Sequence, residues 1–437
     1  MSLKKFVRGL TPEWLLSMYH FCIALAAALR YGFPSREIVT IGVTGTKGKT
    51  STANFIWACL SAGGIQTGII TTANIRIGKS EVLNAYHMTM PGPFTIQRLL
   101  RQMVDAGCTH CVLETTSEGL KQHREVGIRY DIGVFTNLFP EHLRAHGGSF
   151  ETYKRMKGRM FASMERHPHK IIDDTFIEKI IIANAESEHV DFFLNFPADR
   201  KITFAVEREA SCSARNVRSD DTGVAFDLDD AKFRLTIPGA FNVSNALPAI
   251  IISRLFRIKD EAIAQGLLSL SVIPGRMEKI DEGQDFTVFV DYAHEGASMR
   301  NVLETARAMR PPGNAVIVLL GAEGGGRDTS KRAIMGELCG KMAEHVVVSN
   351  VDPYEDDPKV ILEDIARAVE QTGKTREKDF FVIEDRRAGV EKALSLAKSG
   401  DIVLITGKGA EQSIVIGGKS SPWDDRTVVR GELNKLI

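Results

Sequence analysis

The sequence predicts an α/β fold in which a domain with a phosphate-binding loop is followed by a Rossmann-like domain, and three observations support this. From Glu37 onward, short apolar runs alternate with helical stretches, which is the pattern of parallel strands joined by crossover helices. A glycine-rich turn joins the first of these runs to a helix. A second alternating series begins after Pro274 and Gly275. The 437 residues suffice for two or three domains.

Residues 1–36 are predicted to form an N-terminal helical segment. An apolar run from Trp14 to Leu29 follows the basic residues Lys4, Lys5 and Arg8. The run is shorter than the ~20 apolar residues that a membrane span needs, and no small-residue site for signal-peptide cleavage follows it convincingly. We expect a helix packed on the body of the protein. The alternative is a peripheral contact of residues 1–30 with a membrane surface.

The central domain is predicted for residues 37–273. Its parallel strands are expected at IVTIGVTG, CVLETT, IGVFTNL and KIIIAN. Residues 200–238 change character, because the short strand candidates KITFAV, GVAFDL and FRLTI are separated by Asp, Gly and Ser. We expect a small β insertion or the edge of the sheet there, followed by a helix over residues 242–256.

The C-terminal domain is predicted for residues 274–437. Its strand candidates are FTVFVDYAH, AVIVLLGA, HVVVSN, FFVIED and DIVLITGKG. Their alternation with helical stretches predicts a second, Rossmann-like sheet.

Composition narrows the class of partner and the compartment. Lys plus Arg and Asp plus Glu each number 55, so the charge balance favours a small-molecule or peptide substrate and predicts no nucleic-acid partner. Six scattered cysteines do not form a disulfide scaffold, which predicts a cytoplasmic protein.

The strongest local signal is IVTIGVTGTKGKTST, residues 38–52. A strand, a glycine-rich turn and a helix in this order place backbone N–H groups and a helix N-terminus around phosphate oxygens. Lys49 is expected to hold the β- and γ-phosphates of ATP, and the Thr50 hydroxyl to face Mg²⁺. The alternative is a glycine-rich turn that binds no nucleotide. The predicted ATP-binding residues of this loop are Gly45, Thr46, Lys47, Gly48, Lys49, Thr50 and Ser51.

The compact loop GTKGKTS and several later blocks resemble the Mur ligases and their folylpolyglutamate synthase relatives, and the resemblance covers nearly the whole chain after residue 37. It is nearest to the muramyl-tripeptide synthetases, the MurE type. The resemblance implies a ligase that uses ATP and Mg²⁺, with two metal sites. It implies joining of an amino acid, such as diaminopimelate or lysine, to a UDP-MurNAc-dipeptide-like peptidoglycan precursor through an acyl phosphate.

Two blocks of the central domain carry this resemblance toward the acceptor and the metal. The segment VLETTSEGLKQHR, residues 112–124, is similar to EVSSHxLxQxR, with Glu118 in place of the histidine. The resemblance makes Glu114 a magnesium ligand, although a strand-end acid can also be a plain surface residue. It assigns the muramyl substrate to Thr116, Gln122 and Arg124, and to Thr89 in the reduced match TMPGP.

The segment FTNLFPEHLRAHGGSFETYKRMKGRMF, residues 135–161, resembles the block TNLxxDHLDxHG…Y…K…F. The resemblance places Asn137 near ATP and His142 at a metal. Lys157 falls where the family carries a carbamylated lysine, whose added CO₂ turns a cation into a carboxylate that can share a second Mg²⁺ with His142. The alternative is that Lys157 is one basic residue on a solvated helix face.

Blocks near the domain boundary are similar to those that close on ATP. In PGAFNVSNALPAI, Asn242 and Asn245 are expected near the adenine, although asparagines at a helix start also serve as caps. In PGRMEKI and VDYAHEG, Arg276 is expected to meet the phosphates and Asp291 the ribose or γ-phosphate region. His294 is expected beside them as a catalytic residue, and the alternative is a structural histidine.

Three C-terminal segments bear on the incoming amino acid. GAEGGGRDTSKRAIMG assigns Arg327 to substrate, and GKGAE assigns Gly407, Lys408 and Glu411. Val351-Asp352-Pro353-Tyr354 replaces the DNPR motif whose arginine pairs with the distal carboxylate of diaminopimelate. Asp352 and Tyr354 are therefore expected to contact the amino acid, and the nearby acids suit a lysine-like side chain.

The segment ahead of the phosphate loop departs from the family. Only 36 residues precede Glu37, where most relatives carry a uridine-binding domain of roughly a hundred residues. A lipid-linked or other acceptor without UDP is therefore one alternative, and a folylpolyglutamate synthase-like ligase is another. A non-catalytic nucleotide-binding scaffold would predict loss of Lys49, Glu114, His142 or Lys157, and all four are present. We expect a monomer.

Overall fold

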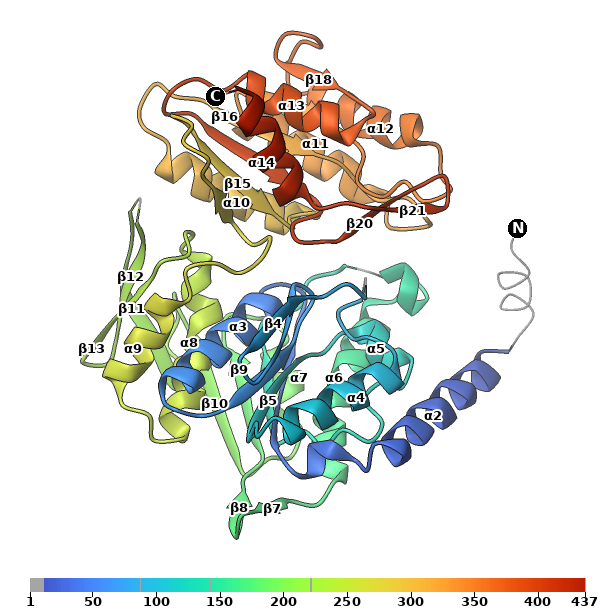
Figure 1. Ribbon diagram of the computed structural model, residues 1–437, viewed down its shortest axis with the longest axis vertical. Helices are drawn as coiled ribbons and strands as arrows, with labels where there is room; N and C mark the ends of the chain where they lie inside the picture. Colours follow the sequence, from blue (N-terminus) through green and yellow to red (C-terminus); the bar gives the residue numbers. More distant parts are fainter. Residues whose placement is uncertain (1–11, 87, 142, 221, 437) are drawn as a thin grey trace.

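The computed structural model of the protein describes residues 12–86, 88–141, 143–220 and 222–436. Figure 1 shows two α/β bodies stacked along the long axis, with the N-terminal helix extending from the lower one. The lower body is built on an eleven-stranded sheet and the upper one on a six-stranded sheet. The predicted fold class, a phosphate-loop domain followed by a Rossmann-like domain, is confirmed.

The central sheet has the strand order β13-β12-β11-β10-β9-β6-β1-β5-β2-β3-β4. Its parallel middle consists of β1 (Val39–Thr44), β2 (Thr67–Ile70), β5 (His110–Glu114), β6 (Ile132–Phe135), β9 (Ile180–Asn184) and β10 (Arg200–Ala205). Every residue of β1, β2, β5, β6 and β9 is buried, because helices cover both faces of a parallel sheet. This explains why these strands read as continuous apolar runs in the sequence.

Antiparallel strands extend both edges of this sheet. At one edge, β11 (Cys212–Asp220) pairs with β10 in parallel, and β12 (Gly223–Leu228) and β13 (Ala231–Leu235) follow as antiparallel strands, where the sequence predicts a sheet edge. The other edge carries β3 (Asn74–Ile77) and β4 (Ser80–Leu83), which were not predicted. A small separate hairpin is formed by β7 (Lys170–Ile172) and β8 (Thr175–Ile177).

Two helical layers cover the central sheet. On one face, α3 (Lys49–Ala62) packs against α8 (Phe241–Leu255) and α9 (Asp260–Ser269), and together they enclose the larger apolar core. On the other face, α4 (Pro93–Asp105), α6 (Phe150–Arg166) and α7 (Val190–Leu194) enclose a second core. The short α5 (Ser117–Lys121) packs on α6, and the 3-10 turns η1 (Pro34–Arg36) and η2 (Leu143–His146) complete this side.

The C-terminal sheet has the order β14-β15-β19-β16-β17-β18 and is parallel except for β14. Its strands are β14 (Glu278–Ile280), β15 (Thr287–Asp291), β16 (Val316–Leu320), β17 (His345–Val348), β18 (Phe380–Val382) and β19 (Ile402–Thr406). One face is covered by α10 (Gly296–Met309), α11 (Ser330–Met342) and α12 (Pro358–Glu370). The other is covered by α13 (Arg386–Ser395) and α14 (Asp425–Leu436), and β20 (Ser413–Ile416) pairs with β21 (Lys419–Pro422) in a hairpin.

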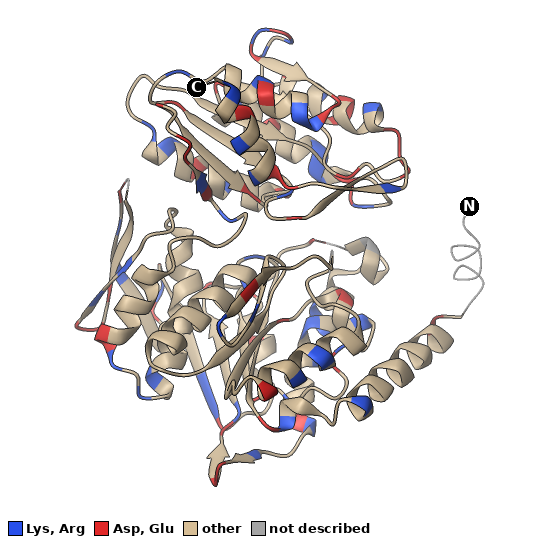
Figure 2. Cartoon of the chain, viewed as in Figure 1, with Lys and Arg blue, Asp and Glu red and all other residues tan. Residues whose placement is uncertain are grey.

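The N-terminal helix α2 (Glu13–Arg30) rests on the body through its last turns. Ala24, Ala27 and Ala28 are buried, and α2 packs on α4. Figure 2 shows charges of both signs spread over the two domains and few along α2. None of the helices in the described ranges is both long enough and apolar enough to cross a membrane.

Candidate active site

The phosphate loop lies at the carboxyl end of β1, at the centre of the sheet. Gly45 and Gly48 adopt φ angles of 149° and 79°, in the region that favours glycine. A Cβ on Gly45 would lie 2.0 Å from Thr136 Oγ1, and one on Gly48 would lie 2.1 Å from Asn245 Oδ1. The loop therefore needs glycine at both positions, which brings its backbone close to neighbours on β6 and α8.

Asn137 holds the loop in shape from the end of β6. The Asn137 carbonyl accepts from Thr46 N at 2.8 Å, and its side-chain Oδ1 accepts from Lys47 N at 2.8 Å. The Lys47 ammonium lies 2.9 Å from Glu141. Asn137, predicted to lie near ATP, is thus part of the loop's support, and Ser51 is buried in the first turn of α3.

Two lysines place their ammonium groups against carbonyls of this loop. Lys49 Nζ donates to Thr46 O at 2.8 Å, and Lys157 Nζ donates to Gly45 O at 2.6 Å. Lys157 is almost fully buried, and its Nζ lies 4.6 Å from the centre of the Tyr153 ring. Burial lowers the pKa of Lys49, and burial together with the charge of Lys49 lowers that of Lys157 strongly. Within the described ranges no carboxylate forms an ion pair with either lysine, so the pair favours an anionic ligand.

Two oxygen ligands suited to Mg²⁺ meet beside Lys49. Thr50 Oγ1 donates to Glu114 Oε2 at 2.8 Å, and Glu114 also accepts from the backbone N of Thr72 at 2.8 Å. His142, predicted as a further ligand, lies outside the described residues. No cluster of three or more His, Cys, Asp or Glu that could hold a metal occurs among the residues described. A magnesium ion here would therefore take its remaining ligands from phosphates and water, which is its usual habit.

Asn242 and Asn245 face the loop from the start of α8. Asn242 Nδ2 donates to Pro238 O at 2.8 Å, and Asn245 Nδ2 donates to Asn242 Oδ1 at 3.0 Å. Neither side chain caps the helix, whose N-cap residue is Ala240. The two asparagine side chains are therefore available to the phosphate loop, and Asn245 lies directly over Gly48.

The C-terminal domain reaches the loop through Arg276. A guanidinium nitrogen of Arg276 donates to Thr50 Oγ1 at 3.2 Å, and the group stacks 4.3 Å from the centre of the Tyr292 ring. Asp291, predicted near the ribose, accepts from Met277 N and Ala293 N at 2.7 Å each. Burial raises the pKa of Asp291. Both of its oxygens thus fix the backbone that carries Arg276 and Tyr292.

His294 is held as a neutral imidazole. Its Nδ1 lies 2.7 Å from the carbonyl of Tyr292, which can only accept, so this nitrogen carries the proton. Burial, reinforced by the positive charge of Lys47, holds the His294 pKa well below its usual range. Nε2 is 3.9 Å from Glu295 Oε1. The arrangement suits a structural or proton-accepting histidine rather than a cation.

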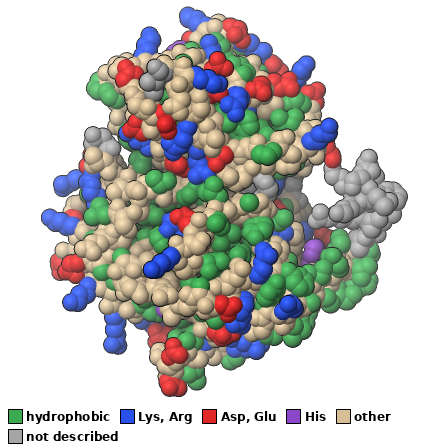
Figure 3. Space-filling view, in the orientation of Figure 1, with side chains coloured by type: hydrophobic (Ala, Val, Ile, Leu, Met, Phe, Trp, Pro, Cys, Tyr) green, Lys and Arg blue, Asp and Glu red, His purple; other side chains and the backbone are tan. Residues whose placement is uncertain are grey.

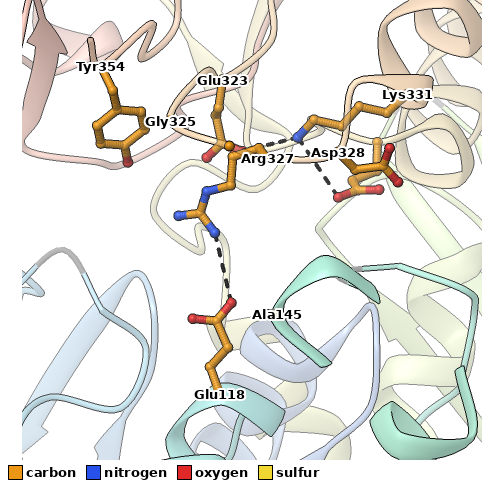
Figure 4. A pocket seen from close by; sticks show the side chains of 10 residues that line it. Glu118, Ala145, Glu323, Gly325, Arg327, Asp328, Lys331 and Tyr354 are labelled. Atoms are coloured by element: carbon orange, nitrogen blue, oxygen red, sulfur yellow. Dashed lines mark hydrogen bonds and ion pairs between the residues drawn. The ribbon is translucent and has the colours of Figure 1, made fainter. Parts of the chain in front are cut away.

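A cavity of about 450 Å³ opens between the two domains. Arg327 reaches across it to within 3.9 Å of Glu118, and Lys331 Nζ lies 3.0 Å from Glu323 Oε2 (Figure 4). The Tyr354 phenol lies on the wall of the same cavity, and its contact with the amino acid stays a prediction. The residues that line the cavity are Glu118, Ala145, Glu295, Glu323, Gly325, Gly326, Arg327, Asp328, Lys331 and Tyr354.

Sequence reasoning missed the acidic lining of this cavity. Burial raises the pKa of Glu295 to about 7. Burial would also raise the pKa of Glu323, but the positive charges of Lys331 and Arg327 and the hydrogen bond from Lys331 hold it below its usual range. One signal was available, because Glu323 is the only charged residue in the glycine-rich run 321–326.

Asp352, Lys408 and Glu411 form a buried cluster behind the cavity. Lys408 Nζ lies 2.7 Å from both Asp352 Oδ2 and Glu411 Oε2, and its side chain is fully buried. Asp352 also accepts from Val415 N at 2.7 Å. Gly407 N donates to Asp291 O at 3.1 Å, which joins the ends of β19 and β15. Four residues predicted to contact substrate do not line this cavity: Asp352, Gly407, Lys408 and Glu411. The buried ammonium of Lys408 takes both acids as counter-ions.

Of the residues predicted to bind the acceptor, one is connected to Glu114 through Thr72, and the others lie in and after α5. Thr89 Oγ1 is 2.7 Å from Thr72 Oγ1, which in turn contacts Glu114. Arg124 donates to Gln122 Oε1 at 2.6 Å and to the carbonyl of Met90. Thr116 caps α5 by accepting from Gly119 N at 3.2 Å. Gln122 and Arg124 thus contact each other, and Arg124 also reaches the carbonyl of Met90, the residue after Thr89, while Thr116 has a structural role.

The phosphate loop follows a central parallel strand, and a second domain faces it across a polar cavity. This arrangement defines a nucleotide-binding enzyme of two α/β domains. Comparison with protein families matches residues 43–253 to the Mur ligase middle domain and residues 275–409 to the Mur ligase glutamate ligase domain. The chain therefore belongs to the Mur ligase family.

Individual relatives agree with this assignment. The chain is 36% identical to UDP-N-acetylmuramyl-tripeptide synthetase of Roseiflexus sp. (strain RS-1), over 98% of the chain and 85% of the relative. It is 34% identical to UDP-N-acetylmuramoyl-L-alanyl-D-glutamate--2,6-diaminopimelate ligase of Geobacillus kaustophilus (strain HTA426), over 97% and 84%.

Solved structures give the same picture of the fold. A structure of a UDP-N-acetylmuramoyl-L-alanyl-D-glutamate--2,6-diaminopimelate ligase is 27% identical with a TM-score of 0.60, covering 91% of this chain and 79% of the other. The folylpolyglutamate synthase of Mycobacterium tuberculosis has a TM-score of 0.70 at 18% identity and covers 95% of both chains. At that identity the second likeness concerns the fold alone.

Proposed function

We propose that the protein is an ATP-dependent ligase of peptidoglycan biosynthesis. It joins the amine of an amino acid to a carboxylate of a UDP-MurNAc-dipeptide-like acceptor and forms ADP and phosphate. The observation that carries this proposal is Lys49, whose ammonium group has no carboxylate partner among the described residues and lies at a phosphate loop beside the buried amine of Lys157, next to a cavity that can hold an amino acid. The names of the two curated relatives support the choice of acceptor.

The proposed work is divided among three units. Residues 37–273 bind ATP and the acceptor, and residues 274–437 bind the amino acid. The helical segment predicted for residues 1–36 contains α2, and its residues 1–11 lie outside the described part of the chain. Burial of Lys49 and Lys157 beside Glu114 and Thr50 costs stability, as their lowered pKa values indicate. A scaffold without a ligand would gain nothing for this cost, which disfavours a non-catalytic protein.

The first chemical step is transfer of the γ-phosphoryl group. An oxygen of the acceptor carboxylate forms a bond to the γ-phosphorus, the bond to the β-γ bridging oxygen breaks, and ADP leaves. Such a transfer needs little covalent help, so most of the stabilisation comes from the charge of Lys49 and from loop N–H groups other than those of Thr46 and Lys47, which donate to Asn137. Arg276, which already touches Thr50, adds a positive charge from the C-terminal domain.

The second step joins the two substrates. The amine nitrogen, deprotonated, attacks the carbonyl carbon of the acyl phosphate, and inorganic phosphate leaves from the tetrahedral intermediate. Arg276 and Arg327 both extend from the C-terminal domain toward the central domain, at Thr50 and Glu118. This closure excludes water, which protects the acyl phosphate from hydrolysis.

Mg²⁺ fits the residues beside the loop. Glu114 and Thr50 would hold one ion through hard oxygen ligands, and the ion would neutralise charge on the phosphates. A second ion is proposed at Lys157 and His142. The buried Lys157 amine, whose pKa is strongly lowered, would react with CO₂ to give a carbamate and release one proton. The product is an oxygen ligand in place of a cation.

Further proposals concern the substrate side chain and the state of the protein. The amino acid is diaminopimelate, lysine or a similar molecule. The cavity lining has more acids (Glu118, Glu295, Glu323 and Asp328) than cations (Arg327 and Lys331), and this excess favours an amino acid with a second ammonium group. We also propose that the protein is a cytoplasmic monomer that contacts a membrane peripherally through residues 1–30.

The test measures phosphate release from ATP with UDP-muramyl-dipeptide as acceptor, crossed against diaminopimelate, lysine and ornithine. Release that requires both the acceptor and one of the amino acids is the expected result. Release that is equally fast without acceptor would contradict the ligase proposal. If the protein binds ATP but releases no phosphate with any of the three amino acids, the choice of acceptor is contradicted.

A further inference from the structure

Helix α2 presents most of its large apolar side chains to solvent. Trp14 is 67% exposed and Leu29 63% exposed, at opposite ends of the helix. Its fully buried residues are small, namely Ala24, Ala27 and Ala28, and Ser17 Oγ lies 2.7 Å from His123 Nε2. Two larger residues, Leu16 and Ile23, are half-buried on this inward side. The exposed large hydrophobic residues of α2 are Trp14, Leu15, Met18, Tyr19, Phe21, Leu25 and Leu29. We call these seven residues the apolar face of α2.

This arrangement is the reverse of an ordinary surface helix. A helix on a soluble protein buries its large apolar residues and exposes charged ones. Here no charged residue occurs between Glu13 and Arg30, and Figure 3 shows hydrophobic side chains along the whole visible side of α2. A continuous exposed apolar surface of this kind marks an interaction site.

We propose that the apolar face of α2 lies in the surface of an anionic membrane, with the helix parallel to the bilayer plane. Charge complementarity selects this occupant, because residues 1–12 contain Lys4, Lys5 and Arg8 and no acid, and they join the first turn of α2 directly. Trp14 and Tyr19 have the apolar ring and polar edge that suit the headgroup region. A helix of 18 residues with this polarity lies on a membrane and does not cross it.

The docked helix places one side of the catalytic domain next to the bilayer. The ring of Phe21 lies 5.9 Å from that of His123, and Lys121 Nζ is 3.4 Å from Glu13. These contacts are made by the segment that carries Gln122 and Arg124, which are assigned above to the acceptor. An acceptor anchored in the membrane by a lipid would reach this segment. Only that consequence rests on the proposed function, because docking itself follows from α2 alone.

The experiment measures co-sedimentation of the full chain with vesicles of phosphatidylcholine and phosphatidylglycerol, and with phosphatidylcholine alone. The variant replaces Met18 and Leu25, two exposed residues of the apolar face, by Lys. The matched control replaces Ile171 and Phe176 by Lys, since these exposed side chains (72% and 57%) lie on the β7–β8 hairpin. We expect the wild type and the control to bind anionic vesicles. The α2 variant should bind them with an affinity that is lower by roughly tenfold or more.

Two outcomes would overturn the proposal. One is equal vesicle binding by the wild type and the α2 variant, or none by the wild type. The other is a dimer in analytical ultracentrifugation that the α2 variant dissociates, because a second copy would then cover the apolar face. Thermal unfolding shows whether the variants remain folded. The ligase proposal is tested separately, by phosphate release with a soluble acceptor. If that proposal fails, the vesicle result can still be interpreted.

Discussion

Buried lysines on the two sides of the site differ in their partners. On the central domain, Lys49 and Lys157 donate to loop carbonyls and have no carboxylate partner among the described residues. On the C-terminal domain, Lys331 pairs with Glu323, and Lys408 pairs with Asp352 and Glu411. Lys49 carries charge that a bound anion can neutralise, and the strongly lowered pKa of Lys157 shows that its buried site disfavours the charged form. On the C-terminal domain, the folded chain neutralises its own charge before any ligand arrives.

This difference separates two ways of using a buried cation. An ammonium group without a counter-ion costs stability, and a binding site accepts that cost because it is recovered when phosphate binds. A paired ammonium stabilises the fold only as long as both partners are present. Substitution of a paired lysine should therefore lower stability, whereas substitution of a lysine without a carboxylate partner should lower activity and leave stability unchanged.

The largest effect on stability is expected for Lys408→Met. The change leaves Asp352 and Glu411 buried without a counter-ion, which costs about 3–5 kcal/mol of the free energy of unfolding. Urea denaturation followed by circular dichroism measures it. Lys341→Met is the matched control, because Lys341 makes only an exposed pair with Glu337. Equal stability of the two variants would remove the distinction between paired and unpaired lysines.

Lys49→Met should act on the rate rather than on the fold. Removing the charge opposite the transferred phosphoryl group should lower kcat about 10²–10³-fold, as loss of one preorganised group does. Phosphate release under saturating ATP measures the effect. Lys154→Met, at a surface pair with Glu151, serves as the control and should retain wild-type turnover. Full activity of the Lys49 variant would refute the assignment of the phosphate loop.

The pH dependence of stability should have opposite signs at Lys157 and Lys408. Burial lowers the pKa of unmodified Lys157, so the unfolded chain binds more protons and stability rises with pH up to the usual lysine value of about 10.4. Burial also acts on Lys408, but Glu411 and Asp352 outweigh it and raise its pKa. Its contribution is therefore present below about 10.4 and is lost as the pH rises through the higher, folded value.

Denaturation of metal-free protein in bicarbonate-free buffer, repeated between neutral and alkaline pH, measures both slopes. Lys157→Met should flatten the rise, and it should leave the protein at neutral pH no less stable than the wild type. A Lys157 variant with the same pH slope as the wild type would show that the amine is not the source of the rise.

The smallest effect is expected for Glu118→Gln. The carboxylate of Glu118 lies 3.9 Å from Arg327, and both side chains are more than 40% exposed. Such a pair contributes at most about 1 kcal/mol. We expect unchanged unfolding and a modest rise in the KM for the amino acid, measured by phosphate release. A loss of several kcal/mol would mean that the two domains depend on this contact.

Residues that are neighbours in the sequence were the predictable part of the molecule. The parallel strands are fully buried and therefore read as apolar runs, and the phosphate loop is continuous from Gly45 to Ser51. β4 was missed because its four residues, Ser80–Leu83, are mostly exposed and do not alternate between polar and apolar. The two sheet edges therefore differ in how readily their sequence reveals them.

Contacts between distant segments could not be predicted in this way. Lys408 and Asp352 are 56 residues apart, and nothing in either segment indicates that they pair. The apolar run of α2 predicted the helix but not its orientation. The structure shows that alanines face inward and that most of the larger side chains face solvent, so the expectation of a packed helix describes only its alanine face.

The most direct test of the central claim is thermal unfolding of the wild type and Lys49→Met, each with and without Mg²⁺ and a non-hydrolysable ATP analogue. A ligand that binds only the folded state raises Tm. The account predicts a clear rise for the wild type and little or none for the variant, although the variant without nucleotide is no less stable than the wild type. An equal rise in both proteins would show that the lysine without a carboxylate partner does not bind phosphate.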